Sequence, residues 1–141
     1  MITFDPRLLN DCEVIGQFKL SHVLLMRDAN YPWVVLVPDR NDVSEVFELS
    51  QEDQQQLNLE SNTLLSFLKE EFNADKMNVA ALGNVVPQLH VHHIVRYKHD
   101  IAWPVPVWGA FPAEAYSDEA LNNIVMQLKK GLKNLQLGFS E

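Results

Sequence analysis

The sequence predicts an α+β fold in which an antiparallel sheet of about five strands packs with one long helix and a C-terminal helix. Three observations predict this class. Short β-rich runs occupy the first third of the chain, a stripe of leucines at helical spacing follows, and two more strand-like runs precede a second helical stretch. Because 141 residues suit one hydrophobic core, we expect a single domain over residues 1–141.

The first three strands are expected at Glu13–Phe18, His22–Arg27 and Trp33–Val37, since β-rich runs alternate there with turn-forming residues. Asp28–Pro32 is expected to form the turn between the second and third strands. Trp33–Val37 is apolar throughout, which is typical of a central strand buried on both faces.

A long helix is expected from Ser50 to about Phe72, with Ser50 as the N-cap of a capping box that Asp53 completes. Its apolar residues recur at helical spacing and predict one stripe that faces the core. The members of that stripe are Leu57, Leu64, Leu65, Leu68 and Phe72. The polar residues expected on the solvated side are Gln51, Asp53, Gln54, Glu60 and Glu70.

Two further strands are expected at Lys76–Leu82 and Leu89–Tyr97. The short link Gly83–Pro87 between them favours antiparallel pairing. Trp103–Gly109 contains too much proline for a strand interior and is expected to be an ordered, extended segment. A second helix is expected from Ser117 to about Leu135.

Charge and composition exclude several classes of function. The net charge is −8 and Lys and Arg do not cluster, so we expect no nucleic-acid partner. No stretch approaches 18 apolar residues, so we expect no membrane span, and the N-terminal residues lack the pattern of a signal peptide. Cys12 is the only cysteine, which fits a reducing cytoplasm, and the carboxylates beside it would raise its pKa.

The most informative stretch is Gln88–Ile94, which holds three of the five histidines and alternates like a β-strand. Because successive strand side chains point to opposite faces, Gln88, His90 and His92 share one face. His93 points to the other face. The strand therefore places two imidazoles and an amide in one row.

This row admits three interpretations. In the first, His90 and His92 are solvent-facing residues of an edge strand. In the second, they bind a metal ion together with His99 or His22, because two Nε2 atoms can converge from one strand face. The chain has no CxxC motif and no carboxylate on the same strand, so we expect no metal.

The third interpretation is nucleophilic chemistry at phosphorus. A neutral imidazole is a competent nucleophile near pH 7, and a second imidazole two residues away can donate to a phosphate oxygen or to the leaving group. The turn Gly83-Asn84-Val85 just upstream would bring backbone N–H groups to a phosphate. In-line attack on an α-phosphate requires these parts.

The segment Gly83–Ile94 resembles the signature of the histidine triad (HIT) superfamily of nucleotide hydrolases and transferases, in which three histidines alternate with apolar residues after a turn of glycine and polar residues. The resemblance covers about residues 13 to 97. It implies a HIT-like fold, a small-molecule nucleotide as partner, no cofactor, and a homodimer whose two sheets join.

The resemblance also implies roles for single residues. His90 would attack the α-phosphorus and form a nucleotidyl-imidazole intermediate that water opens, and His92 would bind the α-phosphate and leaving-group oxygens. The turn Gly83, Asn84 and Val85 would contact the phosphate. Asp28 falls near the residue that binds ribose hydroxyls, and Asn78 falls near another residue on the phosphate side.

Four positions depart from the family pattern, and one of them is His93, which stands where the pattern has an apolar residue. Gln88 replaces the first motif histidine, and although its amide can still order the catalytic strand, it cannot relay a proton as imidazole can. Asn41 stands where the family often has a histidine, and Val85 replaces a hydroxyl residue. These departures imply a loss of rate rather than of binding. The alternative function is therefore a nucleotide-binding or interaction protein with little or no turnover.

The remaining polar and aromatic residues are expected to be mainly structural. We expect His93 in the core or an interface, His22 as a hydrogen-bonded structural histidine, and Arg96 in an ion pair even though it shares the face of His90. Trp103 and Trp108 are expected to pack or to cover a dimer seam, with a nucleobase wall as the alternative.

Overall fold

A five-stranded antiparallel sheet in the order β1-β2-β3-β5-β4 forms the centre of the computed structural model, which describes residues 1–141. The strands are β1 (Cys12–Gln17), β2 (Ser21–Met26), β3 (Trp33–Pro38), β4 (Lys76–Ala80) and β5 (Val91–Arg96). Together with the helices they confirm the predicted α+β class and the five strands, and the pairing of β4 with β5 is antiparallel as expected.

The last two strands are shorter than predicted. The strand expected to run to Leu82 ends at Ala80, and the strand expected to start at Leu89 starts at Val91. The backbone N–H of Leu89 donates to the carbonyl of Val43 in a loop instead of joining the sheet. His90 therefore lies just before the strand.

Helices α2 (Gln51–Glu71) and α3 (Asp118–Leu132) confirm the two predicted helices. Ser50 and Ser117 are their N-caps, and each hydroxyl accepts a hydrogen bond from a backbone N–H three residues on. The carboxylate of Asp53 binds Arg40 and makes no return bond to Ser50. Neither helix, nor any other in the chain, combines the length and the apolar character that a membrane span requires.

Two short helices were not predicted. Helix α1 (Pro6–Asp11) follows Asp5, whose side chain accepts a hydrogen bond from the backbone of Arg7, and a 3₁₀ helix, η1, occupies Val46–Glu48. Both are too short to show apolar periodicity, which explains why the sequence pattern did not reveal them.

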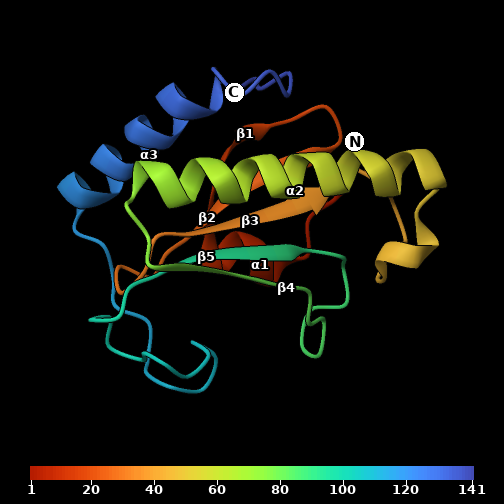
Figure 1. Cartoon of the computed structure of the whole chain (residues 1–141). Helices are drawn as coiled ribbons and strands as arrows, with labels where there is room; N and C mark the ends of the chain where they lie inside the picture. The colour runs from red at the N-terminus through yellow and green to blue at the C-terminus, as the bar shows by residue number, and fades with distance from the viewer.

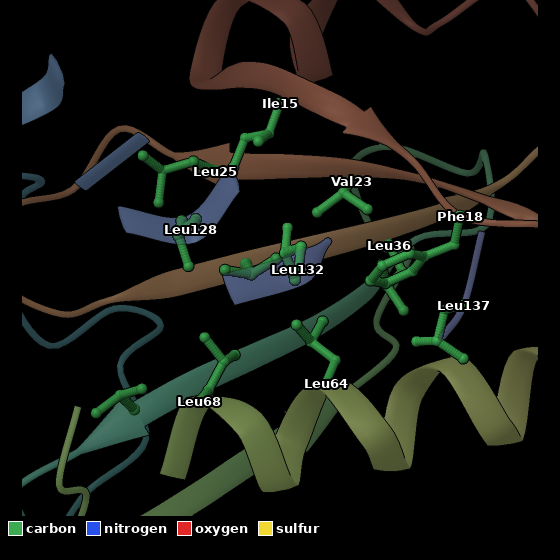
Figure 2. Packing of buried hydrophobic residues seen from close by; sticks show 12 residues of the cluster. Ile15, Phe18, Val23, Leu25, Leu36, Leu64, Leu68, Leu128, Leu132 and Leu137 are labelled. Atoms are coloured by element: carbon green, nitrogen blue, oxygen red, sulfur yellow. The ribbon is translucent and has the colours of Figure 1, made fainter. Parts of the chain in front are cut away.

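Helices α2 and α3 lie on the same face of the sheet (Figure 1). Leu64 and Leu68 of α2 and Leu128 and Leu132 of α3 pack against that face, as Figure 2 shows. The sheet residues that meet them include Ile15, Val23, Leu25, Val34, Leu36 and Val95. Helices α2 and α3 therefore cover this face of the sheet, and the larger hydrophobic cluster lies between them and the strands.

The opposite face is covered by irregular chain rather than by long helices. The N-terminal residues Ile2 and Leu8 and the segment from Ala102 to Val107 pack against it. The sheet residues on this side include Leu24, Trp33, Val35, Val37 and Ile94. Because short segments cover this face only in part, it leaves room for a cavity.

Glu60 was predicted on the solvated side of α2 but is fully buried. Its carboxylate accepts hydrogen bonds from the backbone N–H groups of Leu20 and Ser21, at 2.8 and 3.1 Å, and from the amide of Gln56 at 2.9 Å. Leu20 ends the β1–β2 turn and Ser21 begins β2, and Glu60 gives these two backbone donors the partner that a buried donor needs. Glu60 therefore holds that turn to α2.

Candidate active site

His90 and His92 lie side by side on the face of the sheet opposite α2. Their ring centroids are 4.9 Å apart and the planes meet at 72°. His93 points the other way, where it contacts Ser61 of α2. The face assignment predicted from strand alternation thus holds for all three histidines, although His90 precedes the strand.

A cavity of about 700 Å³ opens beside the two imidazoles. Its walls come from α1, the end of β2, the loop after β4 and the segment from residue 107 to 113. The lining residues that bear on function are Arg7, Leu8, Met26, Arg27, Asp28, Trp33, Gly83, Asn84, Val85, His90, His92, Trp108 and Phe111. Segments far apart in the sequence therefore meet around the histidines.

A hydrogen bond determines which ring nitrogen of His90 carries the proton. Its Nδ1 lies 2.7 Å from the carbonyl oxygen of Gln88, and because a carbonyl can only accept, Nδ1 must carry the hydrogen. The Nε2 atom of a neutral His90 then has a free lone pair. No protein atom bonds that Nε2, so it is available to a bound molecule.

His92 has the opposite proton arrangement. The indole N–H of Trp33 donates to its Nδ1 at 3.0 Å, so the hydrogen of the neutral ring sits on Nε2. Burial lowers the pKa of His92 to about 3, and the neighbouring imidazoles of His90 and His93 add a smaller electrostatic contribution. His92 is therefore neutral at pH 7 and offers an N–H donor beside the lone pair of His90.

His93 uses both ring nitrogens inside the protein. Nδ1 lies 3.2 Å from the carbonyl of Val34 and Nε2 lies 2.7 Å from the hydroxyl of Ser61. Its side chain is fully buried, and burial lowers its pKa to about 4. The expected core role of His93 is confirmed.

Four of the predicted substrate-binding residues line the cavity with the histidines: Asp28, Gly83, Asn84 and Val85. One oxygen of Asp28 accepts the backbone N–H groups of Asn30 and Glu114, while the other has no partner in the protein. Gly83 has a φ of 80°, a conformation that glycine adopts without strain. The side chain of Val85 is mostly exposed.

Gln88 and Asn78 were also predicted at the site, but neither lines the cavity. The Gln88 side chain accepts from the N–H of Asp5 at 2.8 Å and donates to the carbonyl of Thr3 at 3.1 Å. With Asn41 it lines a separate hollow of about 430 Å³. Gln88 and Asn41, two of the four departures from the family pattern, thus lie outside the cavity.

Asn78 meets Arg96 instead of the cavity. Its side-chain oxygen accepts a hydrogen bond from Arg96 at 2.8 Å. Arg96 is itself buried, where it pairs with Asp100 and donates to the carbonyl of Val105. The expected ion pair of Arg96 is present, although it lies in the interior.

The sequence did not reveal Trp33 or Arg7 as site residues, and it offered a wall of the site for Trp108 only as the alternative to packing. Trp108 packs edge-on against His92 at 5.1 Å and against Trp33 at 5.8 Å. It was expected mainly as a packing residue, and here it also forms one cavity wall. The concentration of Trp and Pro in Trp103–Gly109 was the available signal.

The remaining candidates lie outside the cavity. His99 stacks on Tyr97, and His22 bonds the carboxylate of Asp39 at 3.2 Å. No group of three or more His, Cys, Asp or Glu side chains is arranged to hold a metal ion. Cys12 is buried, and burial together with Asp11 raises the pKa of its thiol to about 12, so it is not a thiolate at neutral pH.

A family model described as the HIT domain matches residues 7–99. The chain belongs to the HIT family. The histidine triad protein of Marinobacter aquaeolei VT8 superposes with a TM-score of 0.93 at 47% identity, over 96% of this chain and 98% of that one. A histidine triad protein from Bradyrhizobium japonicum gives a TM-score of 0.89 at 44% identity, over 92% and 96% of the two chains.

A further relative is the Bis(5'-adenosyl)-triphosphatase of Dictyostelium discoideum. The match is 30% identical over 102 residues, and it covers 69% of this chain and 68% of that protein. The matches confirm the predicted family and the HIT-like fold.

Proposed function

We propose that this HIT protein is a nucleotide hydrolase or transferase that cleaves a phosphoramidate or phosphoanhydride bond at the α-phosphate through a nucleotidyl-His90 intermediate. One observation carries the proposal: two adjacent imidazoles present free Nε2 atoms to the same cavity, one with a lone pair and one with a proton. The name of the relative from Dictyostelium, a triphosphatase, supports the reaction class.

The first chemical step is a displacement at phosphorus. The lone pair of His90 Nε2 forms a P–N bond while the bond from phosphorus to the leaving oxygen or nitrogen breaks, and the leaving group keeps that electron pair. A leaving nitrogen takes up a proton from solvent, so that it departs as a neutral amine or as ammonia. The ring becomes cationic, and the Gln88 carbonyl that accepts from Nδ1 stabilises that charge. His92 donates from Nε2 to a non-bridging oxygen of the α-phosphate.

The second step releases the nucleotide. A water oxygen attacks phosphorus, the P–N bond breaks, and its electron pair returns to His90 Nε2. The proton of the water passes to solvent. His90 is then neutral again, with its hydrogen still on Nδ1.

The other predicted residues have supporting roles in this proposal. The unpartnered oxygen of Asp28 would accept a ribose hydroxyl, while Gly83, Asn84 and Val85 would surround the phosphate. Gln88 acts as a positioning residue through its own carbonyl on His90. Asn78 acts only at a distance, by holding Arg96.

We further propose that two chains pair through β4, which is the last strand of the sheet and carries the exposed Val79. Light scattering after gel filtration would give the mass of a dimer, and the mass of a monomer would contradict the pairing. The cytoplasmic location expected from the single cysteine stays a prediction.

The direct test of function uses adenosine 5′-phosphoramidate with the wild type, His90→Ala and His99→Ala. His99 is exposed, lies outside the cavity and serves as the matched control. We expect the wild type and His99→Ala to release ammonia at equal rates and His90→Ala to be slower by about 10³-fold or more. Mass spectrometry of an alkaline quench should find the nucleotidyl group on the peptide that contains His90.

If the wild type and His90→Ala are equally slow while both bind AMP, the hydrolase proposal is wrong. The protein would then be the alternative, a nucleotide-binding protein with little or no turnover.

A further inference from the structure

The N-terminal segment Ile2–Leu8 is held firmly against the start of the catalytic strand. The Gln88 amide bonds the backbone of this segment twice, at Asp5 and at Thr3. The N–H of Ile2 donates to the carboxylate of Asp39 at 2.8 Å, and the side chains of Ile2 and Leu8 are buried. The first turn of α1 therefore has a defined place beside the cavity.

Arg7 is the charged residue that this turn adds to the cavity wall. Its Nε and Nη2 atoms donate to the two oxygens of Asp5 at 3.0 and 2.8 Å. Its Nη1 makes no hydrogen bond in the protein, and 53% of the side chain is exposed. Hydrogen bonds from the side chain and the backbone N–H of Arg7 lower the pKa of Asp5 to about 2.

Arg7 is ion-paired with Asp5, but among the cavity's arginines it keeps a whole terminal nitrogen, Nη1, without a hydrogen bond. His92 is neutral at pH 7 because burial lowers its pKa to about 3. Arg27 lines the cavity too, but both of its terminal nitrogens donate within the protein, to the carbonyls of Leu9 and Asn10 and to Glu13. A phosphate that enters this acidic chain would therefore find its cationic partner in Arg7.

The direction of α1 places Arg7 at one end of the cavity. Asp5 lies two residues before Arg7 and is hydrogen-bonded to it, and the backbone N–H of Asp5 donates to the side chain of Gln88, two residues before His90. At the other end of α1, the carbonyl of Asp11 accepts the N–H of Arg27, which is next to Asp28. Arg7 thus lies toward the reacting phosphate, and the opposite end lies toward Asp28, the proposed ribose contact.

We propose that Arg7 binds the phosphate of the leaving group, so that the preferred substrates are nucleotides whose leaving group itself carries phosphate. This inference rests on the proposed function. When the bridging P–O bond breaks, the leaving phosphate gains negative charge, and the free Nη1 of Arg7 is placed to stabilise it. A leaving amine carries no such charge and gains nothing from Arg7.

The test compares two substrates that share the adenylyl half and differ in the leaving group: diadenosine triphosphate, which releases ADP, and adenosine 5′-phosphoramidate, which releases ammonia. We expect Arg7→Ala to lower kcat/KM for the triphosphate by about tenfold or more and for the phosphoramidate by less than about twofold. Arg7→Lys should lower kcat/KM for the triphosphate less than Arg7→Ala does, since lysine keeps the positive charge but lacks the planar guanidinium with its paired N–H donors.

Two control variants isolate the effect. Arg40 is about as exposed as Arg7 and pairs with Asp53 through the same two nitrogens, Nε and Nη2, but it lies away from the cavity. Arg40→Ala should therefore leave kcat/KM unchanged for both substrates. The double variant Asp5→Asn with Arg7→Ala removes the carboxylate that Arg7 neutralises. If it still discriminates against the triphosphate, the loss comes from the missing arginine and not from an exposed Asp5 charge.

An equal fall for both substrates in Arg7→Ala, or no fall for either, would overturn the proposal. A binding measurement tests the role of Arg7 independently of the proposed function. Binding can be measured by calorimetry in the His90→Ala background, where no turnover is needed. There, Arg7→Ala should weaken the affinity for ADP by about tenfold and leave the affinity for AMP nearly unchanged. If the wild type shows no turnover but the difference between ADP and AMP affinity is found, only the hydrolase proposal is contradicted. If Arg7→Ala changes the affinities for ADP and AMP equally, the role of Arg7 is contradicted.

Discussion

His92 and His93 are neighbours in β5, and burial lowers the pKa of both side chains. They lie on opposite faces of the sheet, where their ring nitrogens have different partners. On the helix side, His93 has partners for both ring nitrogens, Val34 and Ser61. On the cavity side, His92 has a partner for Nδ1 alone. A buried histidine becomes a candidate for chemistry when the fold satisfies one nitrogen and leaves the other facing open space.

The same comparison explains the pairing of His90 with His92. A carbonyl acceptor at Gln88 and an indole donor at Trp33 impose opposite tautomers on two rings 4.9 Å apart. The difference in proton position between these rings therefore comes from their backbone and side-chain partners, since the residues themselves are identical.

After the loss of His90 itself, the largest effect should come from removing the donor on the cavity side. We expect His92→Ala to lower kcat for the phosphoramidate by about 10²-fold or more, because the α-phosphate loses an N–H placed to stabilise its charge. Steady-state kinetics with a circular dichroism check of folding would measure this. A rate within threefold of the wild type would contradict the role of His92.

Trp33→Phe should have the next largest effect. The ring remains in place but the indole N–H is lost, so His92 is free to move its hydrogen to Nδ1 and to turn an acceptor toward the phosphate. We expect kcat to fall by about tenfold with little change in KM for the phosphoramidate. If KM rises and kcat stays constant, Trp33 shapes the cavity without setting the tautomer of His92.

The helix side should respond through stability. The pKa of His93 is about 4 in the folded chain, below the ordinary value of 6.5, so the unfolded chain binds more protons between these values. The free energy of unfolding should therefore fall as pH drops from 6.5 toward 4. Urea unfolding at pH 7.5 and 5 would measure the fall, and His93→Gln should make it shallower. An equal slope in that variant would contradict the assignment.

The smallest effect is predicted for Gln88→His, which restores the family histidine. Because the Gln88 side chain bonds the N-terminal segment rather than lining the cavity, we expect no gain in kcat and a modest loss of thermal stability. A kcat raised by about tenfold would show that position 88 takes part directly in the reaction.

Local sequence rules predicted much of this fold. Ser50 and Ser117 marked the starts of both long helices, and strand alternation separated His90 and His92 from His93. Glu60 was misplaced because the backbone donors that bury it lie 40 and 39 residues away in the β1–β2 turn. No helical pattern within α2 contains that information.

The site was predictable only where one strand carried it. Trp33 lies 59 residues from His92 in the sequence and was read as an apolar strand residue. Arg7 belongs to a six-residue helix with no apolar period, and its place depends on Gln88, 81 positions further along the chain. Tertiary contacts between distant segments made these residues part of the site.

The most direct test of the account is a measurement of the three tautomers by long-range proton–nitrogen NMR at neutral pH, with assignments from His90→Ala, His92→Ala and His93→Gln. The account predicts the hydrogen on Nδ1 for His90 and His93 and on Nε2 for His92. The same tautomer on His90 and His92 would contradict it.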